Sequence, residues 1–112
     1  MVDDCIFCKI IAGDIPSSKV YEDEEVLAFL DISQVTPGHT LVVPKKHARN
    51  LLEMDETATA QLFARVSKVA KKVEATTQAK GMNIISNMEE VSGQTVFHTH
   101  VHIIPRYSDQ DE

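Results

Sequence analysis

Nine residues near the C-terminus alternate with a period of two, and this pattern restricts the fold more than any other in the chain. The segment reads Val96-Phe-His-Thr-His-Val-His-Ile-Ile104. Successive side chains of a β-strand point to opposite faces, so the pattern predicts a strand over 96–104 with His98, His100 and His102 on one face. Three imidazoles on one surface favour chemistry on one small substrate. A polar strand face turned to solvent is the alternative.

The remaining patterns predict a small α+β fold. Residues 5–12, with Gly13 behind them, read as a short helix. Asp55 is a good N-cap for one long amphipathic helix, because apolar residues recur behind it at helical spacing. We therefore expect an antiparallel sheet of about five strands with one long and one short helix, including a hairpin between Val26 and Val43. The earlier strands are expected at 19–21, 25–32, 39–43 and 81–88.

Length and charge narrow the classes of protein. A chain of 112 residues should form a single domain, expected over 1–107, with 108–112 as a short polar tail. The net charge of −6 disfavours a binder of nucleic acid backbones. No apolar run is long enough for a membrane span, and the acidic start is unlike a secretory signal. The sequence thus predicts a cytoplasmic protein without nucleic acid or membrane partners.

Several blocks of sequence carry a family resemblance that extends up to Arg106. The chain resembles the histidine triad (HIT) family of nucleotide hydrolases and transferases, in its bacterial zinc-containing branch, which implies the HIT-like fold. The blocks are His98-x-His100-x-His102-Ile-Ile, Gly93-Gln-Thr-Val, Cys5-Ile-Phe-Cys-Lys-Ile-Ile, Phe29-Leu-Asp-Ile, Pro37-Gly-His-Thr and Val43-Pro-Lys-Lys-His.

The resemblance assigns catalytic roles to three histidines. It implies that His100 is the nucleophile that attacks the α-phosphate of a nucleoside phosphate derivative. A neutral imidazole needs no deprotonation, and a covalent intermediate divides one hard displacement into two easier steps. The resemblance also implies that His102 contacts phosphate oxygens and that His39 joins the proton network. A surface histidine at a turn is the alternative for His39.

The resemblance further implies a nucleotide site. Its phosphate contacts match Asn87, the Gly93 amide, the Thr95 hydroxyl and His102, although Asn87 and Gly93 could merely shape their loop. Asp31 matches the carboxylate that accepts from the ribose hydroxyls, and burial of that carboxylate would require a polar partner. An apolar slot for the base is expected, although such residues are more often core. Its lining residues are Ile6, Phe7, Ile10, Phe29 and Ile32.

The expected activity is hydrolysis of a purine nucleoside phosphoramidate, or a related nucleotidyl conjugate, to the nucleoside monophosphate through a nucleotidyl-histidine intermediate. The alternative is a purine-nucleotide-binding interaction protein with incidental hydrolysis. The resemblance also implies a homodimer. A third possibility, in which the three alternating histidines bind a catalytic zinc, is disfavoured because they would span about 13 Å along a strand.

The two cysteines remain. Spaced three positions apart, Cys5 and Cys8 share a helix face. The set Cys5, Cys8, His47 and His98 has the composition of a closed structural zinc site, and the resemblance implies one zinc per chain. A redox Cys-x-x-Cys would need a thioredoxin-like context that the antiparallel pattern does not offer. Two unligated, half-buried thiols are the other alternative.

Overall fold

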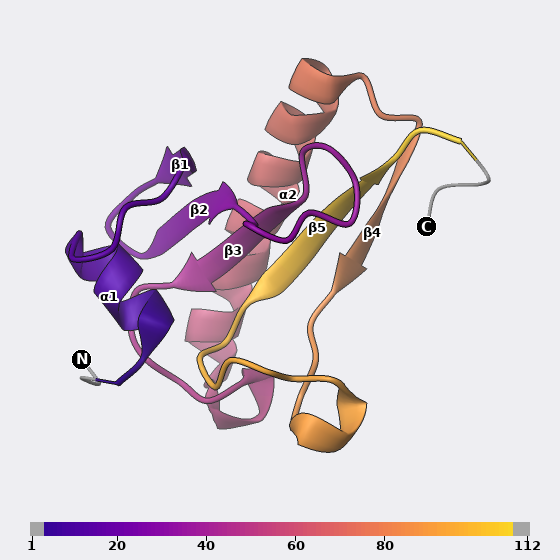
Figure 1. Cartoon of the computed structure of the whole chain (residues 1–112). Helices are drawn as coiled ribbons and strands as arrows, with labels where there is room; N and C mark the ends of the chain where they lie inside the picture. Colours follow the sequence, from indigo (N-terminus) through magenta and orange to yellow (C-terminus); the bar gives the residue numbers. More distant parts are fainter. Residues whose placement is uncertain (1–3, 109–112) are drawn as a thin grey trace.

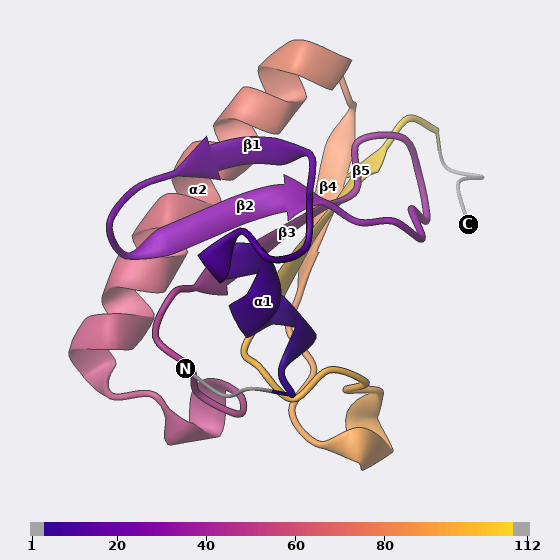
Figure 2. The ribbon, with the colours of Figure 1, turned by 60° about the vertical axis from the view of Figure 1, so that its left-hand side comes forward.

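The computed structural model describes residues 4–108, which form three layers (Figures 1 and 2). Helix α1 (Ile6–Ala12) lies on one face of a five-stranded sheet, and helix α2 (Glu56–Thr77) covers the other. The strands are β1 (Lys19–Glu22), β2 (Val26–Leu30), β3 (Thr40–Pro44), β4 (Gly81–Ile85) and β5 (Val101–Arg106). Two short 3₁₀ turns are η1 (Leu51–Glu53) and η2 (Glu90–Ser92).

The sheet is antiparallel throughout, in the order β1-β2-β3-β5-β4. The predicted class, five antiparallel strands with one long and one short helix, is confirmed. The predicted hairpin pairs β2 with β3 and places Val26 opposite Pro44, so Pro44 is the last residue of β3. A proline is tolerated at such a strand end. Strand β5, far away in sequence, inserts beside β3 and brings the C-terminal histidines to the middle of the sheet.

Helix α2 forms at the position that its N-cap residue and the helical spacing of its apolar residues predict. The Asp55 carboxylate accepts from the Ala58 amide, 2.8 Å away, and so satisfies one of the unpaired amides of the first turn. Leu62, Val66, Val69 and Val73 are buried against one face of the sheet. That face presents alternate side chains of β2, β3 and β5, which leaves the intervening side chains, His102 among them, on the other face.

Helix α1 covers the face that carries the histidines. The Cys5 sulfur caps the helix by accepting from the Cys8 amide at 3.3 Å, and Gly13 ends it with φ 88°, a left-handed conformation that favours glycine. Phe7 and Ile10 pack into a second core with Phe29 and other residues of β2 and β3. The short helix is therefore held by packing and not by its length.

The predicted strand over 96–104 is wrong at its first half. Strand β5 begins at Val101, and residues 95–100 run beside the segment after β3 instead of joining the ladder. The amide and hydroxyl of Thr99 both donate to the Ala48 carbonyl, at 2.8 and 3.1 Å. Only His102 of the three histidines lies in a strand. Two other predicted strands are shorter than expected: 25–32 is β2, and 81–88 is β4.

Two further sequence predictions concern the chain as a whole. Within residues 4–108, no helix is long and apolar enough to cross a membrane. The predicted polar tail, 108–112, lies outside the described residues except for Ser108.

Candidate functional site

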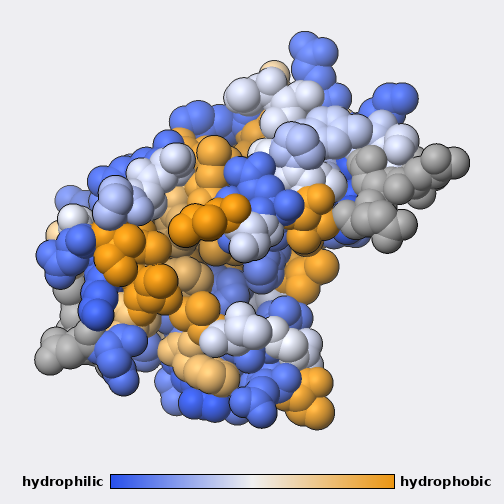
Figure 3. All heavy atoms as spheres, in the orientation of Figure 1, coloured by the Kyte–Doolittle hydropathy of each residue, from blue (hydrophilic) through white to orange (hydrophobic). Residues whose placement is uncertain are grey.

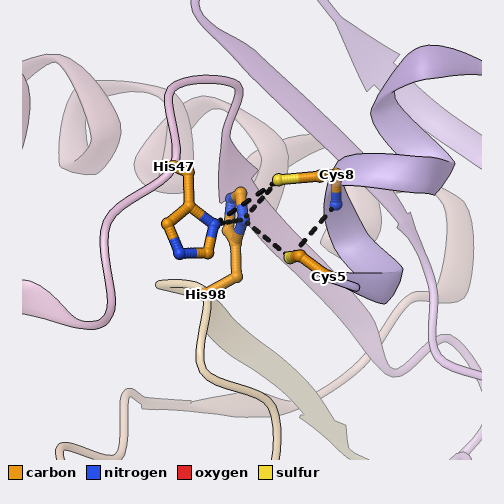
Figure 4. Close-up of side chains that lie close together, drawn as sticks. All are labelled: Cys5, Cys8, His47 and His98. Atoms are coloured by element: carbon orange, nitrogen blue, oxygen red, sulfur yellow. Dashed lines mark hydrogen bonds between the residues drawn. The ribbon is translucent and has the colours of Figure 1, made fainter. Parts of the chain in front are cut away.

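Four side chains predicted as metal ligands converge beneath helix α1 (Figure 4). Cys5 and Cys8 come from the start of α1, His47 follows β3, and His98 precedes β5. Nδ1 of His98 lies 3.4 Å from the Cys5 sulfur, 3.6 Å from the Cys8 sulfur and 3.1 Å from Nδ1 of His47. All four potential ligand atoms lie within 4.8 Å of one another. Neighbouring ligand atoms of a tetrahedral zinc are about 3.3–3.8 Å apart, so the cluster fits this ion.

The protonation of His98 suits a metal ligand. Its Nε2 lies 2.8 Å from the Pro44 carbonyl, which can only accept, so the ring proton is on Nε2 and Nδ1 keeps its lone pair. Burial lowers the pKa of His98 to about 4, so the imidazole is neutral near pH 7. Burial raises the pKa of the Cys5 thiol, so metal binding there releases a proton. His98 thus faces the cysteines and is not a third member of a catalytic row.

His100 is held with its outer nitrogen unprotonated. Its Nδ1 lies 2.8 Å from the carbonyl of His98, and because that oxygen only accepts, the proton is on Nδ1. The Nε2 lone pair is therefore available for attack. Burial lowers the pKa of His100, which keeps the ring neutral. Phe7 contacts the ring edge-on at 5.1 Å, and the Ser86 hydroxyl donates to the His100 carbonyl at 2.8 Å. Ring and backbone are both fixed.

His39 and His102 form a second pair beside His100. The amide of Val35 donates to Nδ1 of His39 at 3.1 Å, so the proton of neutral His39 is on Nε2. That nitrogen lies 2.9 Å from Nδ1 of His102, which therefore accepts and leaves a proton on its own Nε2. Burial lowers the pKa of His39, and it lowers that of His102 to about 4. His102 is thus a neutral N–H donor at neutral pH.

Asp31 reaches the same pair from the end of β2. Its carboxylate lies 3.6 Å from Nε2 of His39, and it also accepts from the Ser33 amide at 3.0 Å. Asp31, His39 and His102 could together be taken for a metal site. However, a metal on Nε2 of His39 would force the proton onto Nδ1, against the Val35 amide. The group therefore favours proton transfer over metal binding.

The loop of predicted phosphate contacts is shaped by a buried amide. Gln94 donates to the carbonyls of Arg49 (2.6 Å) and Val96 (3.0 Å), and it accepts from the Asn50 side chain (3.1 Å) and the Glu89 amide (2.8 Å). Glu89 has φ 75° and ψ 159°, a region that residues other than glycine rarely adopt. Arg49 donates two hydrogen bonds, of 2.8 and 2.9 Å, to the Glu89 carboxylate. The network fixes a strained backbone beside the candidate site.

The predicted phosphate contacts Asn87, Gly93 and Thr95 lie on this loop. A Cβ built on Gly93, where φ is 108°, would sit 3.6 Å from the Asn87 amide nitrogen, so these two positions are close in space. Thr95 is exposed and, with Ile6, borders an open hollow of about 640 Å³ between α1 and the loop. Of the predicted nucleotide residues only Ile6 and Thr95 line this hollow, and Cys5 and His47 of the cysteine and histidine cluster border it as well.

The five residues of the predicted apolar slot differ in burial. Phe7, Ile10 and Phe29 are buried in the core under α1, whereas Ile6 is 45% and Ile32 is 94% exposed. In the face shown in Figure 3, hydrophobic side chains gather over α1 and across the middle of the sheet. The buried three support His100 through Phe7, and the exposed two are free to contact a ligand.

Sequence reasoning assigned no role to Ser86, Asn50, Glu89 or the side chain of Gln94. Gln94 carried a usable signal, because it stands inside the block Gly93-Gln-Thr-Val. Ser86 carried none, since its hydrogen bond is to a residue distant in sequence. Asn50 caps η1 locally through the Leu52 amide, but its contact with Gln94 is with a residue distant in sequence.

Comparison with known proteins identifies the family. Residues 12–109 match the model of the HIT domain. The chain belongs to the HIT domain family. The match begins after Cys5 and Cys8, so the proposed metal ligands of this HIT protein rest on the cluster itself and on individual relatives.

Two relatives and two solved structures illustrate the likeness of this HIT protein. Protein hit of Bacillus subtilis is 57% identical over 109 residues, which are 97% of this chain and 75% of that protein. Adenylylsulfatase HINT3 of Arabidopsis thaliana is 38% identical over 104 residues, which are 93% and 53% of the two chains. A crystal structure of a Streptococcus mutans protein has a TM-score of 0.96 at 64% identity, and the match covers 100% of this chain and 72% of that one. The crystal structure of a Zn-bound histidine triad family protein from Mycobacterium smegmatis has a TM-score of 0.92 at 39% identity, and the match covers 97% of this chain and 80% of that one.

The resemblance inferred from the sequence is thus confirmed, and so is the HIT fold. The family of this HIT protein includes hydrolases, one of them the adenylylsulfatase above.

Proposed function

We propose that this HIT protein hydrolyses purine nucleoside phosphoramidates, or related nucleotidyl conjugates, to the nucleoside monophosphate through a nucleotide covalently bound to His100. One observation carries the proposal. The His98 carbonyl holds the proton of His100 on Nδ1, at 2.8 Å, and so leaves Nε2 of this buried, neutral ring unprotonated. This is the state that a nucleophilic imidazole needs.

The proposed reaction has two balanced steps. In the first, Nε2 of His100 forms a bond to the α-phosphorus while the bond from phosphorus to the leaving nitrogen breaks, and the leaving amine takes up a proton. In the second, water attacks phosphorus and loses a proton to the His39–His102 pair, which replaces the proton that this pair delivered to the leaving amine, while the bond to Nε2 breaks and the monophosphate leaves. His102 supports both steps as a neutral Nε2–H donor to a phosphate oxygen, and His39, bonded to His102 at 2.9 Å, supports proton movement.

The remaining contacts complete the proposed nucleotide site. Asn87, the Gly93 amide and Thr95 would contact phosphate oxygens beside His102. Asp31 would accept from the ribose hydroxyls, for which its carboxylate must turn from His39, 3.6 Å away. The base would lie against the slot lined by Ile6, Phe7, Ile10, Phe29 and Ile32. The adenylylsulfatase relative supports an adenylyl group as the transferred part.

Replacement of His100 tests the proposal. His100→Gln retains an N–H for the His98 carbonyl but has no nucleophilic nitrogen, so it serves as the matched variant beside His100→Ala. With adenosine 5′-phosphoramidate we expect kcat to fall at least about 10³-fold in both, while adenosine monophosphate binding, measured by calorimetry, stays within about threefold. Retained turnover would falsify the role of His100.

The same assay separates an enzyme from a binding protein. A wild-type kcat/KM far below about 10⁴ M⁻¹s⁻¹ for phosphoramidate, aminoacyl adenylate and dinucleoside polyphosphate alike would favour an interaction protein that binds purine nucleotides.

We also propose one structural zinc per chain, held by Cys5, Cys8, His47 and His98. The donor set and the mutual distances support it, as does the Zn-bound relative. The ion would stabilise the fold by joining α1 to the segments before β5 and after β3. A homodimer and a cytoplasmic location belong to the same proposal.

A further inference from the structure

Two cysteine sulfurs lie close together at the start of α1 (Figure 4). Cys5 and Cys8 are free thiols, and every pair of potential ligand atoms in their cluster lies within 4.8 Å. Residues three apart on a helix also meet the Cα separation that a disulfide spans, about 4.4–6.8 Å. Rotation of the two side chains can therefore join the sulfurs with little movement of α1.

The two cysteines differ in accessibility. Cys5 is 8% exposed and borders the open hollow of about 640 Å³ between α1 and the loop that carries Thr95. Cys8 is 1% exposed, packs in the core with Phe7 and Val43, and does not line this hollow. A small oxidant that enters the hollow therefore reaches Cys5 first and finds Cys8 behind it.

Zinc ligation sets the reactivity of such a pair. A cysteine that binds zinc is deprotonated, and the thiolate is the form that hydroperoxides oxidise to a sulfenic acid. A sulfenic acid with a second thiol beside it condenses to a disulfide, which protects it from further oxidation. In a reducing compartment such disulfides are transient and serve as sensors. One accessible sulfur with a buried sulfur beside it fits this use.

The same cluster holds the proposed nucleophile in place. Nδ1 of His98 faces the two sulfurs at 3.4 and 3.6 Å, and the His98 carbonyl accepts the Nδ1 proton of His100 at 2.8 Å. Phe7, which stands between the two cysteines in α1, contacts the rings of His98 and His100 edge-on, with ring centres 5.9 and 5.1 Å apart. The state of the two sulfurs therefore reaches the His100 ring through a hydrogen bond and a ring contact.

We propose that Cys5 and Cys8 form a redox switch for the nucleotide site: a hydroperoxide joins the two zinc-bound thiolates as a disulfide, the metal leaves, and His100 loses its fixed position. This inference rests on the proposed zinc and on the proposed role of His100. A disulfide removes both sulfur ligands at once, and two imidazoles alone do not make a closed four-ligand site. The pair thus controls its own protein, unlike a thioredoxin-like pair that exchanges disulfides with others.

The oxidation has two balanced steps. The Cys5 thiolate attacks one peroxide oxygen and the O–O bond breaks, which leaves a sulfenic acid on Cys5 and an alkoxide or hydroxide that takes up a proton. The Cys8 thiolate then attacks the Cys5 sulfur, the S–O bond breaks, and the departing hydroxide takes up a proton to become water. Two electrons pass from the sulfurs to the peroxide, and a thiol reductant returns them.

Hydrogen peroxide added to zinc-loaded wild type tests the inference. A few equivalents should give a disulfide between Cys5 and Cys8, found by mass spectrometry of the digested protein, and a zinc-sensitive dye should report about one zinc released per disulfide. With adenosine 5′-phosphoramidate, kcat should fall at least about tenfold as the disulfide forms. A thiol reductant with added zinc should restore the zinc content and kcat.

Aspartate variants separate the two thiols, because a carboxylate also binds zinc but cannot be oxidised by peroxide. In Cys8→Asp, Cys5 should react at about the wild-type rate and stop as a sulfenic acid that dimedone traps. In Cys5→Asp, whose aspartate is also a good N-cap, the buried Cys8 should react at least about tenfold more slowly. Equal rates in the two zinc-loaded variants would show that Cys5 is not the first sulfur to react.

The wild-type measurement decides the inference without the variants. Oxidised protein that keeps its zinc, that carries a sulfinic acid in place of the disulfide, or that keeps its kcat once the disulfide has formed would overturn it. A reduced wild type that binds no zinc would overturn the zinc proposal as well. Turnover that survives His100→Ala would instead overturn the proposed function, whatever the state of the sulfurs.

Discussion

Backbone groups decide which nitrogen of each histidine carries the proton. The carbonyls of Pro44 and His98 place it on Nε2 of His98 and on Nδ1 of His100, while the Val35 amide places it on Nε2 of His39. Three chemically identical side chains therefore present different nitrogens, as the proposed metal ligand, the proposed nucleophile and a proton donor require. None of these differences follows from the residue type, because a neutral imidazole can carry its proton on either nitrogen.

Acidification should destabilise the protein through His102. Burial lowers its pKa from 6.5 to about 4 in the fold. The unfolded chain takes up a proton near pH 6.5 and the folded chain only near pH 4, so the free energy of unfolding is constant above this window and falls within it. Because His102 remains partly in contact with water, we expect a loss of about 1–2 kcal/mol, measured by urea unfolding.

Acid would also weaken binding at the proposed metal site, in wild type and variant alike. Comparison with His102→Gln therefore isolates the contribution of His102. The difference in free energy of unfolding between wild type and variant should shrink or reverse from about pH 7 to about pH 4.5. Parallel pH profiles would contradict the assignment.

Among the polar residues of the loop that carries Asn87, Gly93 and Thr95, replacement of Gln94 should lower the free energy of unfolding most. Gln94→Leu leaves the Asn50 amide, the Glu89 amide and the Arg49 carbonyl without this partner in a buried place. We expect the free energy of unfolding to fall by about 2–3 kcal/mol in urea. Thr95→Val, at its exposed neighbour, should cost less than about 0.5 kcal/mol. Equal effects would show that the network is not stabilising.

The short elements depend on contacts outside themselves. Helix α1 has seven residues, too few to be stable alone, and it is held by Phe7 and Ile10 in the core and by the sulfur atoms at its start. Residues 96–100 continue the alternating pattern of β5, yet they leave the sheet because Thr99 and His98 find acceptors at Ala48 and Pro44. Local pattern therefore locates both helices, whereas the stability of α1 and the first residue of β5 depend on contacts with distant residues.

Zinc removal should loosen α1 first. Elemental analysis should find about one zinc per chain, and a chelator should lower Tm by about 5 °C or more, because the ion binds only the folded cluster. Amide hydrogen exchange in 6–12 should rise more than in α2. In Cys8→Ser the chelator should have little further effect. A metal-free wild type with unchanged Tm and unchanged exchange would contradict the zinc proposal.

The two faces of the sheet are covered to different extents, and β1 and β4 are its edge strands. Helix α2 covers one side of the sheet, whereas α1 covers only the β2–β3 part of the other, where the loop between β2 and β3 also packs against the end of β5. Strand β4 is an edge strand with Ile84 44% and Ile85 40% exposed. An unpaired apolar edge is a site for pairing with another chain.

The edge suggests where the expected homodimer forms. Sedimentation at micromolar concentration should give a dimer, and Ile84→Lys should shift it to monomer by placing a charge at that edge. Val91→Lys, at a residue that is 98% exposed on η2, is the matched control and should remain dimeric. A monomeric wild type, or a dimeric Ile84→Lys, would contradict this placement.

The sequence by itself determined the class, both helices, most strand positions and the identity of the histidines and cysteines. It did so because caps, turns and periodicity are local: Asp55 predicts α2, and Gly13 predicts the end of α1. The resemblance also grouped Cys5, Cys8, His47 and His98, and the fold brings these four side chains together.

Only the tertiary structure decided how the histidines divide their work. The alternation of 96–104 placed His98, His100 and His102 in one row, but hydrogen bonds to residues 44–48 turn His98 toward the cysteines and separate it from the other two. The Gln94 network depends likewise on neighbours distant in the chain. A local pattern records which side chains are available, whereas proton positions and charge pairing depend on which distant atoms the fold brings within hydrogen-bonding distance.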